Sequence, residues 1–204
     1  MGFVSGYLIA ILSVTYAAVL AMGLLTLPTP AHPIQNPWFT IMELLILVLA
    51  PVMVVFTTSL RAWVPPTGKS AAVLGIVFMA MCAVVTCSVH FVVLTLSRQP
   101  AFIETDWALL MFSFTWPSLV YALDILAWDI FFPLSALSIA LALRGTVQTK
   151  ALQMLFIGSA MLAFLGLAGI PLEDMNIRNI GIVGYVVLFP CGTALLAYRF
   201  KRSH

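Results

Sequence analysis

The chain has 204 residues, of which 63% are hydrophobic and only 8% are charged. A soluble domain usually carries about 25% charged residues and cannot bury this much apolar surface in one core. The composition therefore excludes an ordinary soluble protein and predicts an all-α protein that crosses a membrane several times. The formal net charge of +2 comes without a basic patch outside short loops, so we expect no nucleic-acid partner.

Apolar runs divide the chain into six predicted spans, because a membrane-spanning helix needs about 20 apolar residues. Proline, glycine and charged residues separate the runs and mark the loops between them. We expect the spans at residues 3–27, 38–60, 70–96, 117–143, 151–170 and 177–198. Together they would form a single polytopic transmembrane domain over residues 1–204.

The fourth hydrophobic segment, from Trp107 to Leu143, is too long for one straight span at about 1.5 Å per residue. Its first part, residues 107–115, is expected to form a short helix in the membrane interface. Pro117 is a favourable first residue for a helix, and Thr115 just before it could cap that helix. The span proper is therefore predicted to begin at Pro117.

The basic residues orient the predicted spans. Seven of the nine follow spans two, four and six: Arg61, Lys69, Arg144, Lys150, Arg199, Lys201 and Arg202. By the positive-inside rule, both termini are expected in the cytoplasm, and the protein in the plasma or inner membrane. Arg98 and Arg178 fall on the outer side. We expect Arg178 to pair with Glu173 or Asp174 in its own loop, or alternatively to close over the acidic residues of the spans.

The second, fourth and sixth spans each hold a proline near the middle, Pro51, Pro133 and Pro190. A proline inside a helix frees the carbonyl four residues earlier and kinks the helix. The pattern suggests three hairpins, each with a kinked second helix, that would splay in the outer half and leave a cavity there. Coincidence is the alternative, because proline is frequent in membrane helices.

Four ionisable residues lie inside the predicted spans: Glu43, His90, Asp124 and Asp129. The helical rise places the first three roughly 8 to 10 Å below the outer edge and Asp129 deeper. A charge at the bilayer centre costs about 2.5 to 3.5 kcal/mol or more, so such groups face protein or water and mark a functional site by default. We take Asp124, Glu43 and His90 as candidate acid/base residues; a structural ion pair between Glu43 and His90 is the alternative.

Asp124 and Asp129 are five residues apart, about 140° around an α-helix, so we expect them on different faces. Asp124 shares its face with Tyr121, Trp128 and Phe132. Aromatic rings beside a carboxylate suit a cationic ligand, although the same rings could form an ordinary packing stripe. Asp129 could serve as a relay acid or cap backbone freed by the proline that follows.

The candidate ligand-binding residues are therefore Trp128, Tyr121, Asp129, Trp116 and Phe132. Trp116 also fits the aromatic belt of a membrane interface. We expect no metal, because only one histidine lies inside a span, and a catalytic zinc site usually needs several histidine or cysteine ligands. The same count excludes a bis-histidine haem, and the lysines, all in loops or the tail, disfavour retinal. We therefore expect no cofactor.

Three classes of function remain open, and the sequence contains no motif of a known catalytic family. The first is a binder or small enzyme that takes a lipid or lipophilic small molecule into an outer cavity, with isomerase- or cyclase-like acid/base chemistry. The second is a proton-coupled transporter, which the absence of ionisable residues in the inner halves of the spans disfavours. The third is an accessory subunit of a membrane complex or a homo-oligomer.

Overall fold

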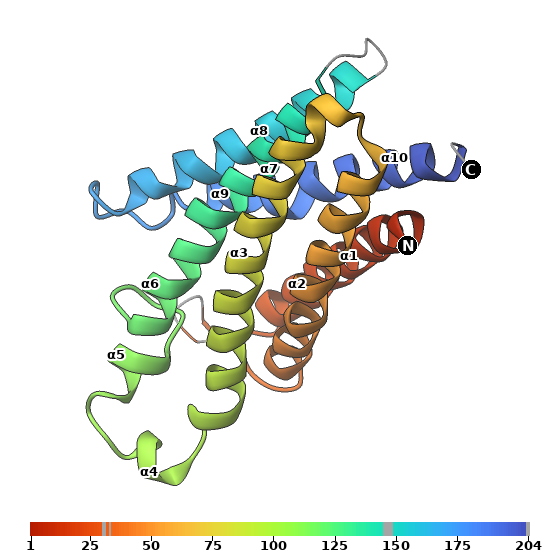
Figure 1. Cartoon of the computed structure of the whole chain (residues 1–204). Coiled ribbons are helices and arrows are strands. Elements are labelled where there is room, and N and C mark those ends of the chain that lie inside the picture. The colour runs from red at the N-terminus through yellow and green to blue at the C-terminus, as the bar shows by residue number, and fades with distance from the viewer. Residues whose placement is uncertain (30–31, 33, 145–148, 203–204) are drawn as a thin grey trace.

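The computed structural model describes residues 1–29, 32, 34–144 and 149–202. Within these residues, six helical segments are long and apolar enough to cross a membrane: Gly2–Leu25, Trp38–Trp63, Pro66–Leu96, Leu119–Ala142, Lys150–Gly169 and Asn179–Arg202. This confirms an all-helical protein with six apolar helices, as a multipass membrane protein requires (Figure 1). The lipid environment explains why the apolar runs are helical, since a helix satisfies all its backbone hydrogen bonds internally.

The first three spans are continuous, whereas the later spans contain turns of other geometry. The first three consist of α1 (Gly2–Leu25), α2 (Trp38–Trp63) and α3 (Lys69–Leu96), which the short 3₁₀ turn η1 (Pro66–Gly68) precedes. The fourth consists of α6 (Leu119–Ile125), the π-helix η2 (Leu126–Phe131) and α7 (Phe132–Ala142). The last two consist of α8 (Lys150–Gly166) with η4 (Leu167–Gly169), and of α9 (Asn179–Val183), the π-helix η5 (Gly184–Leu188) and α10 (Phe189–Arg202).

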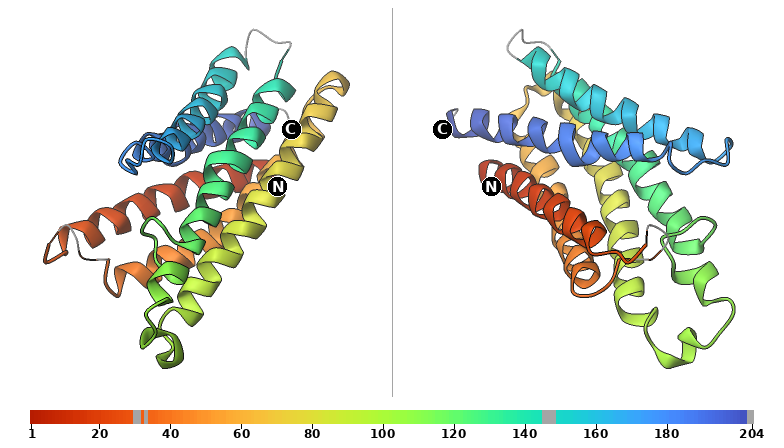
Figure 2. Two further views of the ribbon diagram at one scale, coloured as in Figure 1. Left: turned by 90° about the vertical axis from the view of Figure 1, so that its left-hand side faces the viewer. Right: turned by 180° about the vertical axis from the view of Figure 1, so that it is seen from behind.

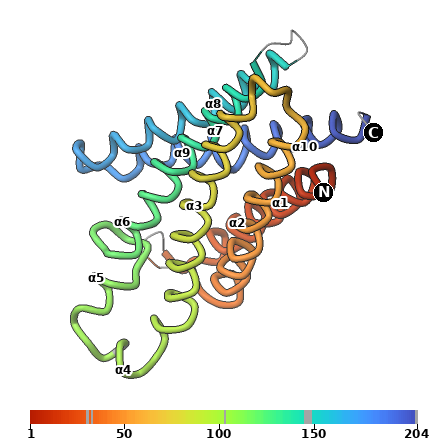
Figure 3. Tube along the Cα trace, viewed as in Figure 1, coloured from red at the N-terminus to blue at the C-terminus, as the bar shows by residue number. Residues whose placement is uncertain are grey.

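The first and last spans lie side by side and bring the two ends of the chain together (Figure 2). Small residues allow this close approach, because a Cβ on Gly6 would lie 2.7 Å from the Cβ of Ala197. Other closely packed pairs are α1 with α2, α2 with α3, α3 with α7, and α8 with both α7 and α9. The trace in Figure 3 shows that α1 and the sixth span diverge away from the termini. We call that end of the bundle, where α1, α3 and α8 stop and α2, α6 and α9 begin, the cavity end.

The helix of the fourth span begins at Leu119 rather than at the predicted Pro117. The reason is Ser118, whose backbone is extended and whose side-chain oxygen accepts a hydrogen bond from the backbone N–H of Tyr121 at 3.1 Å. A serine in this position satisfies one of the free N–H groups of a helix start. Thr115 therefore lies outside the helix and does not cap it. Two short helices precede this point, α4 (Pro100–Ile103) and α5 (Ala108–Phe112), and the second falls within the predicted segment 107–115.

Both π-helices end immediately before a Phe–Pro pair, Phe132–Pro133 after η2 and Phe189–Pro190 after η5. Proline cannot donate to the carbonyl four residues earlier, so the helix nearby must change its hydrogen bonding. Wider π turns are one such change, and they often occur at functional sites. Pro51 lies instead within the continuous helix α2. Spans four and six thus resemble each other, and the threefold repeat stays a prediction.

Candidate functional site

A cavity of about 640 Å³ lies at the cavity end of the bundle. Side chains from α1, α2, α3, α6 and the sixth span line it, together with residues of the connections between helices. Most of the lining is apolar, and small-molecule sites typically have volumes of about 300 to 1,000 Å³. The ionisable lining residues are Tyr16, His32, Glu43, His90, Arg98, Tyr121, Asp124, Arg178 and Tyr185. The sequence predicted a cavity at the outer ends of the spans, and the assignment of this end to the outer side stays a prediction.

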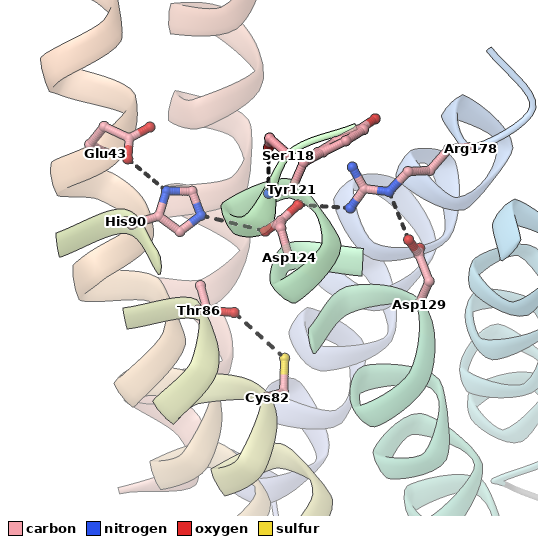
Figure 4. Close-up of polar contacts among 9 residues, drawn as sticks. All are labelled: Glu43, Cys82, Thr86, His90, Ser118, Tyr121, Asp124, Asp129 and Arg178. Carbon is pink, nitrogen blue, oxygen red and sulfur yellow. Dashed lines mark hydrogen bonds and ion pairs between the residues drawn. The ribbon is translucent and has the colours of Figure 1, made fainter. Parts of the chain in front are cut away.

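Five charged or titratable side chains form a continuous series of contacts beside the cavity (Figure 4). His90 Nδ1 lies 2.8 Å from Glu43 Oε2, and His90 Nε2 lies 3.7 Å from Asp124 Oδ1. Arg178 donates from Nη2 to Asp124 Oδ2 and from Nε to Asp129 Oδ2, each at 2.7 Å. We call these five residues the ionic row. It connects α2, α3, the fourth span and the start of the sixth.

All five members of the ionic row are buried, with exposed fractions of 3% for Glu43, 6% for His90, 8% for Asp124, 0% for Asp129 and 7% for Arg178. Burial removes the hydration of a charge, so a buried charge needs an opposite charge and hydrogen bonds. Each carboxylate of the row has such a partner. The predicted contact between Glu43 and His90 is therefore present, within a larger network that also includes two aspartates and an arginine.

Arg178 does not make the ion pair with Glu173 or Asp174 that the sequence favoured, and instead takes the alternative position against the acidic residues of the spans. Local turn geometry explains the difference. Asp174 Oδ1 accepts hydrogen bonds from the backbone N–H and the side-chain amide of Asn176, each at 3.0 Å. This turn occupies Asp174 within its own loop. Arg178 then begins the sixth span with its side chain directed into the bundle.

Asp124 and Asp129 bind the same guanidinium, although α-helical spacing predicts that they lie on different faces. The π-helix η2 begins between them, at Leu126. In a π turn the hydrogen bond joins residues i and i+5, so side chains five apart lie closer to one face than in an α-helix. The forked guanidinium then spans the remaining separation by using two different nitrogens.

Asp129 has an additional feature, since its Oδ1 is the only buried side-chain nitrogen or oxygen in the described residues without a hydrogen-bond partner. A Cβ on Gly181 would lie 3.1 Å from this oxygen, and one on Gly166 would lie 3.6 Å from it. The two glycines therefore leave space for the carboxylate between spans five and six. Asp129 lies outside the lining of the cavity, behind Arg178.

The aromatic residues predicted to bind a ligand lie in different places. Tyr121 and Trp128 line the cavity, and Arg178 Cζ lies 4.7 Å from the centre of the Tyr121 ring. Phe132 is fully buried in the core and packs against Trp128, with ring centres 5.6 Å apart. Trp116 is 38% exposed, lies outside the cavity lining and meets Tyr121 edge-on. The helical face predicted for Asp124 thus supplies two cavity residues and one core residue.

Sequence reasoning did not identify three of the polar cavity residues, Tyr16, Tyr185 and Arg98. A signal for Tyr185 was present, because it lies seven residues after Arg178 and therefore on the same helical face. Tyr16 lies in the first span among apolar residues, a position that resembles an ordinary membrane helix. Arg98 follows the end of α3, and only the fold brings it to the cavity.

The charges of the ionic row do not balance. Three carboxyl groups face one guanidinium and one histidine, and when all three are ionised the row carries a net negative charge even with His90 protonated. Arg178 donates to Asp124 Oδ2 at 2.7 Å, so this oxygen is already engaged in the structure. The His90 ring lies between two carboxyl groups, Glu43 at Nδ1 and Asp124 at Nε2, where an imidazole can take up or release a proton. The arrangement can attract a cation and exchange one proton.

Comparisons of the chain with protein-family models, with curated protein sequences and with solved structures find no match. The function must therefore be argued from the cavity and the ionic row.

Proposed function

We propose that this multipass membrane protein binds a small lipophilic cation in the cavity, and that His90 loses its proton as the cation binds. The observation that carries the proposal is a buried row with more carboxyl groups than basic groups beside a mostly apolar cavity of about 640 Å³. A negative site in low-dielectric surroundings attracts positive charge strongly. With the cytoplasmic termini that the basic residues predict, the ligand would enter from the outer side of the membrane.

The walls of the cavity support a ligand with an apolar body. Leu20 of α1, Ile46 and Leu49 of α2, and Val93 of α3 all contribute apolar surface. The rings of Tyr121 and Trp128 lie on the helix that carries Asp124, and aromatic faces attract cations by about 0.5 to 2 kcal/mol. The apolar body would occupy the wide part of the cavity while the cationic group meets Asp124 and its aromatic neighbours.

Three probes that share one phenylbutyl body test the charge preference. We expect phenylbutyltrimethylammonium to bind about tenfold more tightly than phenylbutanol, which corresponds to about 1.4 kcal/mol, and phenylbutanoate to bind most weakly. Calorimetric titration of the purified protein in maltoside detergent measures the three affinities. Asp124→Asn should reduce the affinity for the ammonium probe about tenfold and leave that for the alcohol unchanged.

Asp106→Asn is the matched control, because it removes an exposed carboxylate that lies outside the cavity lining. It should bind all three probes like the unaltered protein. Equal affinities for the three head groups, or equal effects of the two substitutions, would contradict the proposed function.

The same ammonium probe should bind more tightly as the pH rises, until His90 is neutral. A protonated His90 places a positive charge beside the ligand cation, so protonation of His90 weakens binding of the cation. For one proton, the affinity can rise by at most tenfold per pH unit. Because the probe has a permanent charge, the protein alone titrates. In His90→Gln the affinity should not change with pH over the range in which the unaltered protein responds. A pH dependence that persists in this variant would assign the proton to another group.

Acid/base chemistry on the bound ligand is a second candidate. It is favoured by the Glu43–His90 pair, in which a carboxylate orients an imidazole at 2.8 Å and leaves the other ring nitrogen toward the cavity-lining Asp124. Enzymes use this arrangement to position a general acid or base. Release of a chemically altered ligand by the purified protein, and its loss in Glu43→Gln, would distinguish catalysis from binding alone.

A further inference from the structure

Seven of the nine basic residues are predicted on the cytoplasmic side of the membrane. The other two, Arg98 and Arg178, both line the cavity. Their surroundings differ. Arg178 is buried between two carboxylates, whereas Arg98 is exposed and belongs to none of the ion pairs in the described part of the chain. The cavity therefore has one guanidinium inside, which is paired with carboxylates, and a second one at its edge. The second has no acidic partner in the described part of the chain.

Neutral groups hold Arg98 in place. Its Nη2 donates to Asn36 Oδ1 at 3.0 Å, and its Nη1 donates to Thr40 Oγ1 at 3.3 Å. Its Cζ lies 4.5 Å from the centre of the Phe39 ring. These contacts fix the direction of the guanidinium without cancelling its charge, and a guanidinium has five N–H donors in all. Arg98 thus presents an oriented positive charge at the edge of the cavity.

Arg98 and the ionic row lie at different depths. On α2, Phe39 beneath Arg98 precedes Glu43 by four residues, or about 6 Å of helix. On α3, His90 precedes the helix end at Leu96 by six residues, or about 9 Å, and Arg98 follows in the next turn. The cavity therefore has an interior rich in carboxyl groups and a positive edge, separated by roughly 6 to 9 Å along the helices.

We propose that the cavity holds two opposite charges at once, a cationic group of the ligand at the ionic row and an anionic oxygen group at Arg98. This rests on the proposed function, because the negative row determines which end of the ligand enters. An arginine binds carboxylate or phosphate through charge-assisted hydrogen bonds. The anion is carried by the ligand itself or by the phosphate of an adjacent lipid, and the experiment below distinguishes these two sources.

A series of linear trimethylammonium compounds of increasing length, each ending in a carboxylate or in its methyl ester, tests the proposal. At the best length, the carboxylate should bind about tenfold more tightly than its ester, since a hydrogen bond to an ionised group is stronger than one to a neutral group. Shorter and longer compounds should lose this gain, because they cannot reach both charges. Calorimetric titrations in maltoside detergent, which lacks phosphate, measure the ratio for each length.

Substitutions locate the anion site. Arg98→Gln should bring the ratio of carboxylate to ester affinity to one, and Arg98→Lys should keep part of the gain. Thr40→Val removes a neutral hydrogen-bond partner of Arg98 but leaves the guanidinium charge, so the carboxylate should still bind more tightly than its ester. Arg61→Gln, which changes an exposed arginine at the end of α2, is the matched control and should have no effect. Thermal unfolding of each variant verifies that it is folded.

Repeating the titrations in phosphatidylcholine nanodiscs separates the sources of the anion. A gain in both media assigns the anion to the ligand, and a gain in detergent alone assigns the site to lipid phosphate; either result supports an anion site at Arg98. A ratio of one at every length in both media would overturn it. If the ammonium esters still bind and Asp124→Asn weakens them, the proposed function survives that failure. If no ammonium compound binds, both proposals fail.

Discussion

Replacing Arg178 with leucine should destabilise the protein by about 3 to 5 kcal/mol, the cost of breaking a buried ion pair by removing one partner. Asp129 is fully buried and Asp124 is 8% exposed, so neither can recover its hydration within the fold. The expected result is a large fall in the midpoint of thermal unfolding in detergent, or loss of folded protein on purification.

Two comparisons separate this effect from simple loss of a side chain. Arg144→Leu changes an exposed arginine at the far end of the fourth span and should have little effect. Combining Arg178→Leu with Asp124→Leu and Asp129→Leu removes the whole charged cluster around the guanidinium. Because hydrophobic replacement of a complete buried ionic cluster is often neutral or stabilising, the triple variant should recover much of the stability. If Arg178→Leu unfolds like the unaltered protein, the two ion pairs do not contribute to the fold.

Gly184→Ala should also destabilise the protein strongly, by about 3 kcal/mol, the upper range for overpacking. Its Cβ would lie 2.5 Å from the backbone carbonyl oxygen of Ser159, a contact that side-chain rotation cannot relieve. The same two residues are joined by a hydrogen bond of 2.8 Å from Ser159 Oγ to the Gly184 carbonyl. Separation of α8 from η5 would therefore also remove the partner of a buried hydroxyl.

Gly158→Ala is the matched control, because its Cβ would meet only the flexible end of Leu188, at 3.2 Å. We expect its midpoint of thermal unfolding to stay close to that of the unaltered protein, while that of Gly184→Ala falls. Equal midpoints for the two variants would mean that α8 and the sixth span have more room at Gly184 than the contact distance indicates.

The six apolar helices were predictable because a lipid-exposed chain has few alternatives to a helix. The predicted second span starts at Trp38, as α2 does, and the predicted third span ends at Leu96, as α3 does. The start of the fourth helix was less predictable, since Pro117 and Ser118 both favour helix starts and the choice depends on the path of the preceding loop. Orientation and oligomeric state remain predictions.

The ionic row was predictable only in part. The sequence predicted that Glu43, His90 and Asp124 lie at a similar depth, because the rise per residue of a helix is regular. The contacts of Arg178 depended on one local feature, the turn around Asp174, and on one nonlocal feature, the position of Arg178 beside span four. The common face of Asp124 and Asp129 depended on a π turn, which α-helical periodicity cannot represent.

The long sequence separation within the ionic row has a consequence for biosynthesis. Asp124 can meet His90 of the preceding span as soon as both are made, whereas the partner of Asp129, Arg178, follows it by 49 residues. At about 5 to 20 residues per second, the delay is roughly 3 to 10 s. During that interval Asp129 must be protonated or remain in a polar environment, because hydrocarbon would penalise its charge. The fourth span therefore reaches its final environment around Asp129 only after the start of the sixth span has been made.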